Sequence, residues 1–203
     1  DAYEAGNYTA AISVFQNLAE KRFGIMPGHA GAQSYLGFLY NNGRGVAQDR
    51  KEAVEWFRLS ADQGHATAQT NLGLAYYNGI GVAQDYKEAI EWFRKAAEQG
   101  QTTAQTKLGL AYYQGSGVAQ DYKEAMKWFL MSANRGDAEA QTNLGVMYDN
   151  GQGIAQDRTE SAKWYRQAAE QGHVAAQFIL GDATHIGRGV AQDRKEAEKW
   201  YRK

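Results

Sequence analysis

The sequence lacks several features that would point to common classes of protein. It has no cysteine, so it has no disulfide framework, and its single proline fits an almost wholly helical chain. No apolar run approaches the roughly 18 residues of a membrane span, so we expect no membrane insertion. Lys and Arg number 22 against 23 Asp and Glu, for a net charge of -1 without any basic run. We therefore expect no nucleic-acid partner, because no positive field would attract one.

What the sequence has is a repeated phrase with a fixed period. Leu-Gly pairs begin at Leu36, Leu72, Leu108, Leu144 and Leu180, each 36 residues after the last. An Ala-Gln pair comes four residues before each of them, and a Gln-Asp pair follows twelve residues after. A fixed period of this length is typical of a stacked repeat array, in which each repeat contacts only its neighbours.

The first half of each repeat predicts a helix that ends in a glycine turn. In residues 65–100, apolar side chains recur at helical spacing around Leu72, which predicts an amphipathic helix of about three turns. A glycine inside this helix, Gly73, costs about 1 kcal/mol relative to alanine. Its recurrence therefore indicates that another helix packs too closely for a Cβ atom. Gly79 and Gly81 follow, and we expect both to adopt positive φ.

The second half predicts another helix. Asp85 with Glu88 three residues later is typical of a capping box, with Asp in place of Ser or Thr. Apolar residues then recur at helical spacing through Trp92, and Gly100 is placed to cap the end of the helix. Neither helix can bury its apolar face alone, so the repeats should stack as an all-α solenoid. We expect the tryptophans and tyrosines that recur in every repeat to pack in its core.

Residues 29–203 resemble the Sel1-like repeat family, which is related to the tetratricopeptide repeats. The resemblance rests on the kernel Leu72-Gly73-x2-Tyr76, the turn Gly79-x-Gly81-Val82 and the residues from Asp85 to Gly100. It implies a right-handed α-solenoid of stacked antiparallel helix pairs, with the first helix of each pair on the concave face. It also implies binding to other proteins in bacterial signalling, envelope biology or host interaction, without general catalytic residues.

These patterns predict one array over residues 1–203. We expect an N-terminal half-repeat or cap at 1–28, in which residues 8–20 look like a second helix without its first and 21–27 form an irregular loop. Full repeats follow at 29–64, 65–100, 101–136 and 137–172, with a partial repeat at 173–203. In the last repeat Thr184 replaces the recurring tyrosine, so its first helix either packs more loosely or adapts to a following repeat.

The candidate binding residues are those on the first helices that the core does not need. An apolar strip with tyrosine anchors and a row of hydroxyls would suit a peptide lying in a groove. Acidic residues near the end of the array, including Asp193, predict that a basic part of the ligand binds there. The candidate positions are Ser34, Phe38, Asn41, Thr70, Leu74, Tyr77, Asn78, Thr106, Leu110, Tyr113, Val146, Asp149 and Asp182.

Other functions remain open alternatives. One is an enzyme of the penicillin-binding or β-lactamase type, although no Ser-x-x-Lys set is present. Another is a structural spacer whose inner face is filled by neighbouring side chains. The glycine turns follow helices and lack Gly-Lys-Ser/Thr, so we expect no phosphate site. His29, His65 and His173 lie one or more repeats apart, too far for shared zinc ligation. We expect no cofactor or metal, a monomer, and a periplasmic or secreted location rather than a cytoplasmic one.

Overall fold

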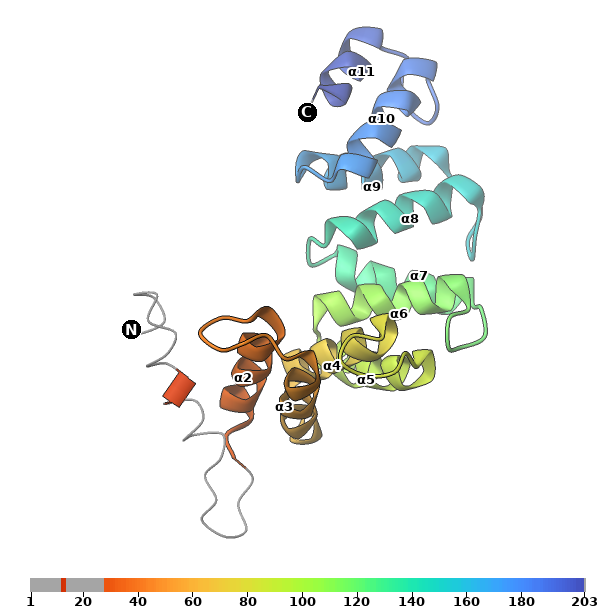
Figure 1. The fold of residues 1–203 in the computed structure, drawn as a ribbon. Coiled ribbons are helices and arrows are strands. Elements are labelled where there is room, and N and C mark those ends of the chain that lie inside the picture. The colour runs from red at the N-terminus through yellow and green to blue at the C-terminus, as the bar shows by residue number, and fades with distance from the viewer. Residues whose placement is uncertain (1–11, 14–27, 203) are drawn as a thin grey trace. The chain divides into compact units, whose positions relative to one another are not determined.

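The computed structural model describes residues 12–13 and 28–202, and residues 28–202 form ten helices joined by turns, without a strand in this part of the chain (Figure 1). We call the first helix of each repeat helix A and the second helix B. The A helices are α2 (Ala30–Asn42), α4 (Ala66–Asn78), α6 (Thr102–Gln114), α8 (Ala138–Asn150) and α10 (Val174–Ile186). The B helices are α3 (Arg50–Asp62), α5 (Tyr86–Glu98), α7 (Tyr122–Ala133), α9 (Arg158–Glu170) and α11 (Arg194–Tyr201).

The chain divides into two compact units, residues 1–104 (unit 1) and 105–203 (unit 2), with the boundary inside α6. In unit 1, α3 packs against both α2 and α4, and α4 packs against α5. In unit 2 the same succession runs from α7 to α11, each helix packing on the next. The predicted all-α solenoid of stacked helix pairs is confirmed. None of the described helices is long and apolar enough to span a membrane.

The expected half-repeat at the N-terminus lies almost wholly outside the described residues, and so does the loop at 21–27. Ile12 and Ser13 are the exceptions, and both are helical. Ile12 is buried in a cluster with Ala32, Leu36 and Leu39 of α2. An apolar residue from this segment therefore covers the first helix A.

The glycine inside helix A marks a close approach of helix B, as predicted. A Cβ atom added to Gly73 would lie 2.6 Å from Cδ1 of Phe93 and 3.2 Å from the carbonyl oxygen of Ala89. The same aromatic position of helix B faces Gly145, where the neighbour is Tyr165. The absent side chain thus lets a buried aromatic ring lie directly on the backbone of helix A.

The second glycine of the turn meets two requirements at once at Gly81, Gly153 and Gly189. Gly81 has a φ of 75°, as expected, and a Cβ atom there would clash with the carbonyl oxygen of Arg50. Arg50 is the first residue of α3, so the turn of one repeat sits on the start of helix B in the preceding repeat. Gly189 lies on Arg158 in the same way. Val82, the residue after Gly81 in the chain, is half-buried.

The recurring Gln-Asp pair fastens the turn between the two helices. The carboxylate of Asp85 accepts hydrogen bonds from the amides of Lys87 (2.9 Å) and Glu88 (3.1 Å), as an N-cap does. The amide of Asp85 donates to the carbonyl of Tyr76 at 3.0 Å, so the reciprocal bond to Glu88 expected of a capping box is replaced by one to helix A. The side chain of Gln84 donates to the carbonyl of Tyr77 at 2.8 Å.

The recurring Ala-Gln pair joins successive repeats. Gln69 is 4% exposed, and its Nε2 donates to the carbonyl of Ala61 at the end of α3. Its Oε1 accepts a hydrogen bond of 2.8 Å from Nε2 of Gln99. Gln141 repeats both contacts, with Ala133 and Gln171. Because both ends of the buried amide are satisfied, a polar residue can lie inside the stack.

Most of the recurring aromatic residues are buried, although not all to the same degree. Trp92, Trp128 and Trp200 are buried, whereas Trp56 and Trp164 are half-buried. Among the recurring tyrosines Tyr76 is buried, and the others are half-buried. The expectation of core packing is therefore met by the first group and only in part by the second.

The last helix A keeps its turn despite the loss of the tyrosine. Thr184 is 3% exposed, and its hydroxyl donates to the carbonyl of Leu180 at 2.7 Å. Its own carbonyl accepts from the amide of Asp193, as the carbonyl of Tyr76 does from Asp85. The contact that fixes the turn belongs to the backbone, so the substitution leaves it intact.

Candidate functional site

The apolar strip predicted on the A helices has four members that are partly accessible. Phe38, Leu74, Leu110 and Val146 occupy one repeat position, and each is half-buried. Asp182 takes this position in the last repeat and is exposed. We call the surface that carries this row the helix A face.

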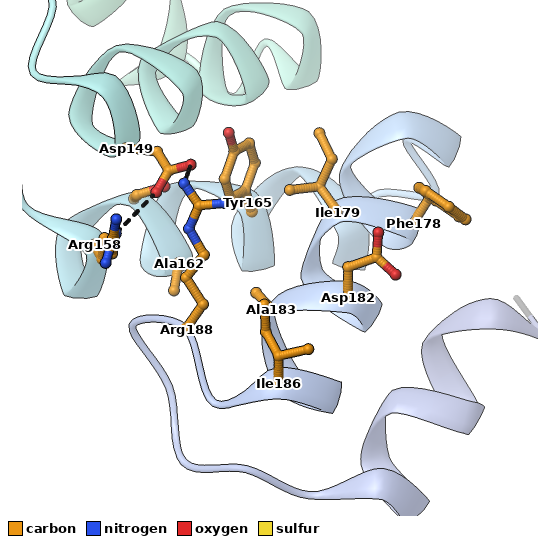
Figure 2. Close-up of a pocket in the computed structure, with 11 residues that line it drawn as sticks. Asp149, Arg158, Ala162, Tyr165, Phe178, Ile179, Asp182, Ala183, Ile186 and Arg188 are labelled. Atoms are coloured by element: carbon orange, nitrogen blue, oxygen red, sulfur yellow. Dashed lines mark ion pairs between the residues drawn. The ribbon is translucent and has the colours of Figure 1, made fainter.

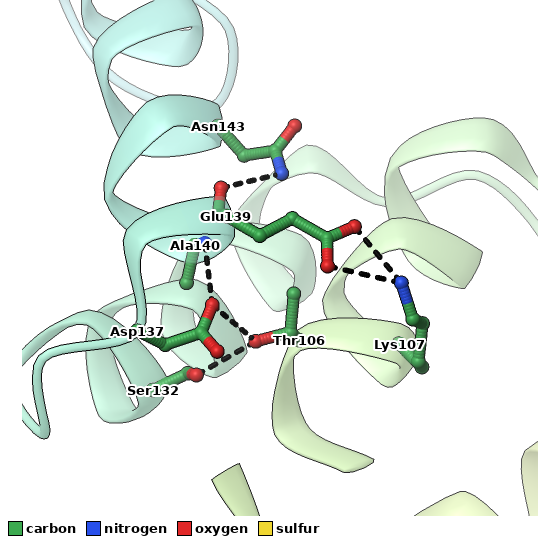
Figure 3. A network of polar contacts seen from close by, with 7 residues as sticks. All are labelled: Thr106, Lys107, Ser132, Asp137, Glu139, Ala140 and Asn143. Atoms are coloured by element: carbon green, nitrogen blue, oxygen red, sulfur yellow. Dashed lines mark hydrogen bonds and ion pairs between the residues drawn. The ribbon is translucent and has the colours of Figure 1, made fainter. Parts of the chain in front are cut away.

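The expected row of exposed hydroxyls is wrong. Ser34 and Thr70 are each 6% exposed, and Thr106 is 1% exposed. The hydroxyl of Thr106 lies 2.7 Å from Oγ of Ser132 and donates to Oδ1 of Asp137 at 3.1 Å (Figure 3). Asp137 caps the next helix A, so that helix covers this position. The Thr106 hydroxyl therefore stabilises the stack, whereas Ser34 lines a hollow of unit 1.

The N-terminal halves of adjacent A helices are joined by further polar contacts in unit 2. Nζ of Lys107 binds both carboxylate oxygens of Glu139, at 2.9 and 3.0 Å (Figure 3). One repeat later, the hydroxyl of Thr142 lies 3.0 Å from Nδ1 of His173. The open part of the helix A face therefore lies toward the C-terminal ends of these helices.

In unit 1 the helix A face is hollowed between α2 and α4. A pocket of about 240 Å³ has Phe38, Asn41, Leu74 and Asn78 among its walls, all of them candidate positions. The other lining residues come from α3, α4 and the following turn, and they are Val54, Phe57, Asn71, Ala75 and Ile80.

A second hollow of unit 1 adjoins the first. It has a volume of about 330 Å³ and shares Phe38 and Asn71 with the first pocket. Tyr35 stacks on Phe38 with ring centroids 5.9 Å apart, and the guanidinium of Arg44 lies 5.2 Å from the Phe38 centroid. The two hollows adjoin at Phe38 and Asn71, and together we call them the unit 1 groove.

Unit 2 has a pocket at the equivalent repeat position, between α8, α9 and α10. Its volume is also about 240 Å³, and we call it the unit 2 pocket (Figure 2). Asp149 replaces Asn41, Asp182 replaces Leu74 and Arg188 replaces Ile80, each three repeats further along. The backbone frame is therefore the same, but charged side chains line the second pocket.

The acidic residues of the unit 2 pocket already have partners. Oδ2 of Asp149 lies 2.6 Å from Nη2 of Arg188, and Oδ1 lies 3.7 Å from Nε of Arg158. Asp182 accepts a hydrogen bond of 2.6 Å from the hydroxyl of Tyr201. Two arginines thus accompany the two aspartates, so the formal charges of the side chains that line this pocket sum to zero.

The two tyrosines expected as anchors are held by their own repeats. Tyr77 meets Tyr86 edge to face at 5.1 Å between ring centroids, and Tyr113 meets Tyr122 at 5.4 Å. The hydroxyl of Tyr113 also donates to Oε1 of Gln152 in the next turn, at 3.0 Å. Both rings are half-buried, so part of each is still accessible.

These contacts follow a rule that the sequence did not reveal. The residue between the two turn glycines meets a residue near the C-terminal end of helix A in the preceding repeat. Gln152 meets Tyr113, and Arg188 meets Asp149. At the unit 1 groove the same pair is Asn41 and Ile80, which both line the pocket. Each pocket is therefore finished by a turn residue from the next repeat.

Of the three histidines that share a repeat position, His29 and His65 cap helix N-termini with their side chains, whereas His173 makes no such bond and meets Thr142 instead. Nδ1 of His29 accepts from the amide of Ala32, and Nδ1 of His65 accepts from the amide of Ala68, both at 3.3 Å. Burial, and then the charge of His29, lower the pKa of His65. The neutral ring is the form that can accept the amide, so His29 and His65 have a structural role as caps.

The floor of the unit 2 pocket contains a buried phenol. Tyr165 is 4% exposed, and burial together with the negative charge of Asp149 raises its pKa to about 12. At neutral pH its hydroxyl is therefore uncharged. The charges of this pocket come from the arginines and aspartates alone.

Comparison with known proteins agrees with this architecture. The Sel1 repeat model matches residues 30–65, 66–101, 102–137, 138–173 and 174–203. A Sel1 repeat protein from Oxalobacter formigenes is 34% identical with a TM-score of 0.91, over 99% of this chain and 78% of that one. No curated protein matches the chain.

Two further structures are similar. A protective antigen of uropathogenic Escherichia coli strains, described as displaying an SLR fold, is 37% identical with a TM-score of 0.89, over 98% of this chain. This chain spans only 42% of that protein. An immunity protein from Pseudomonas aeruginosa shares the fold at 19% identity, with a TM-score of 0.57 over 96% of this chain and 72% of that one. Five matches in unbroken succession show that the chain belongs to the Sel1 repeat family, whose members are generally non-catalytic scaffolds for protein interactions.

Proposed function

We propose that this protein binds an extended segment of a partner protein on the helix A face of unit 1, with apolar side chains of the segment in the unit 1 groove. The observation that carries the proposal is the pair of adjoining hollows on this face, which share Phe38 and Asn71. A spacer without a groove would have this face filled by neighbouring side chains.

The lining of the groove suits a peptide. Phe38 and Leu74 offer half-buried apolar walls, and burying the rest of such side chains drives association. Asn41, Asn71 and Asn78 stand beside them. Asparagine amides both donate and accept, as the backbone of an extended segment requires.

The test uses a peptide selected from a random 12-residue display library on the intact protein. Its affinity is then measured by fluorescence anisotropy for Phe38→Ala/Leu74→Ala. We expect a loss of about thirtyfold or more, because truncation of two apolar anchors removes about 2 kcal/mol or more of binding energy.

The matched control is Leu59→Ala/Met131→Ala, which truncates two apolar side chains exposed on B helices. It should leave the affinity unchanged, and circular dichroism should show both double variants to be folded. Equal affinity of the parent and the groove variant, with a loss in the control, would place the site on the B helices and refute the proposal.

A further inference from the structure

In the unit 2 pocket the two arginines have more N–H donors than the carboxylate of Asp149 can accept. Arg158 and Arg188 both approach the carboxylate of Asp149, at 3.7 and 2.6 Å. A guanidinium has five N–H donors, whereas one carboxylate has two oxygens. The side chains of the arginines are 52% and 42% exposed, so a ligand can reach them. Figure 2 shows this charged group at one end of the pocket and Phe178 and Asp182 at the other.

The fourth charged group of the pocket is held away from the arginines. Asp182 accepts its hydrogen bond from Tyr201 of α11, and Arg158 and Arg188 have their ion pairs with Asp149. The group of two arginines and one aspartate carries a formal charge of +1. The chemistry that complements it is a carboxylate.

Apolar side chains line the rest of the pocket. Phe178 and Ile186 are 59% and 62% exposed, and Ile179 is half-buried on the same helix. The pocket volume of about 240 Å³ is below the roughly 300–1,000 Å³ of sites for drug-sized ligands. It therefore suits about one residue, and a residue that combines an apolar side chain with an adjacent carboxylate occurs only at the end of a chain.

We propose that the unit 2 pocket binds the C-terminal residue of a protein partner, with the α-carboxylate on Arg158 and Arg188 and an aliphatic side chain against Ile179 and Ile186. This inference goes beyond the proposed function, because it assigns to unit 2 a site with its own ligand chemistry. It replaces the expectation of a basic ligand part at this end of the array.

The repeats supply a comparison within the chain. In repeat 1 the residues equivalent to Asp149, Arg158 and Arg188 are Asn41, Arg50 and Ile80. The unit 1 groove thus has neither the carboxylate nor the arginine of the turn. Arg50→Gln is therefore a matched control that removes an arginine from the same repeat position without touching the unit 2 pocket.

The experiment is an NMR titration of the full-length 15N-labelled protein with three probes: N-acetyl-leucine, N-acetyl-leucinamide and N-acetyl-lysinamide. We expect the acid to bind at least tenfold more tightly than either amide, with shifts at Ile186 and Arg188. Arg158→Gln/Arg188→Gln should remove this preference, and Arg50→Gln should keep it. Asp149→Asn should tighten binding of the acid, because it removes the competing internal carboxylate.

The outcomes that overturn the proposal are distinct. Three results with the parent protein would overturn it: equal binding of acid and amide, preference for the lysinamide, or no chemical-shift change at the pocket. None of these results depends on the folding of a variant. Weaker binding of the acid to Asp149→Asn would also contradict it. If the selected peptide still needs Phe38 and Leu74 while the acid shows no preference, this inference fails and the proposed function stands.

Discussion

Tyr165 differs by one hydroxyl from the residues at the same position of the earlier repeats, Phe57, Phe93 and Phe129. In each repeat the ring lies against the glycine of helix A. The phenol can ionise where the phenylalanines cannot, and its burial makes the anion unfavourable. The single oxygen atom of this hydroxyl therefore makes the stability of the core depend on pH.

Tyr165→Phe should therefore change the response to alkaline pH. The folded-state pKa of about 12 lies above the ordinary value of 10, so the stability linked to the neutral phenol is fully present below pH 10 and is lost as pH rises toward 12. We expect the parent to lose more free energy of unfolding than Tyr165→Phe between pH 9.5 and 11.5. Urea melts measure it, and parallel loss in both proteins would contradict it, since all other tyrosines and lysines titrate in both.

The sequence was a good guide to residues whose role is set within one repeat. The glycines at positive φ, the Asp85 cap and the close approach at Gly73 follow from backbone geometry that local spacing encodes. It was a poor guide to Thr70 and Thr106. Helical periodicity shows toward which side of the helix a side chain points, but not whether a neighbouring helix covers that point of the helix. At Thr106 the N-terminal end of the next helix A covers the side chain.

At the scale of elements, each helix pair is organised by contacts of the backbone as well as by buried side chains. The turn is fixed from both sides by Gln84 and Asp85, and helix A lies on helix B through Gly73. The unit 2 pocket escaped prediction at this scale, because Arg188 and Asp149 belong to different repeats and meet only after stacking.

Gly73→Ala tests whether helix propensity or the close contact with helix B has the larger effect on stability at this position. The added methyl raises helix propensity by about 1 kcal/mol. Overpacking against Phe93 and the rigid Ala89 carbonyl costs about 1–3 kcal/mol, so we expect net destabilisation of about 1 kcal/mol in a urea melt. Gly31→Ala, where only the side chain of His29 lies near, should be neutral or stabilising. A Gly73→Ala protein more stable than the parent would show that the close contact relaxes at no cost.

For the whole molecule, stability should be distributed over the repeats, because each one contacts only its neighbours. In unit 2 the residues by which α8 meets α7 have equivalents in α10. Gln177 donates to Ala169 as Gln141 donates to Ala133, and Ala176 and Leu180 are buried as Ala140 and Leu144 are.

Deletion of residues 138–173 should therefore leave a folded protein in which α10 stacks on α7. We expect unchanged helical circular dichroism per residue, lower stability, and a urea m-value smaller by roughly a fifth, in proportion to the surface that unfolding exposes. Analytical ultracentrifugation of the same sample would detect association of the shortened stack. A large loss of helicity would mean that the repeats are not interchangeable.

The turn residue that closes the pocket of the preceding repeat has a consequence for how such arrays diversify. Because Asp149 comes from one repeat and Arg188 from the next, binding chemistry belongs to junctions and not to repeats. Duplicating or reordering repeats keeps the types of buried contact between them. It also creates new combinations of pocket-wall residue and turn residue. A genome can thus obtain new specificities by recombination alone, and a protein engineer could do the same without redesigning a core.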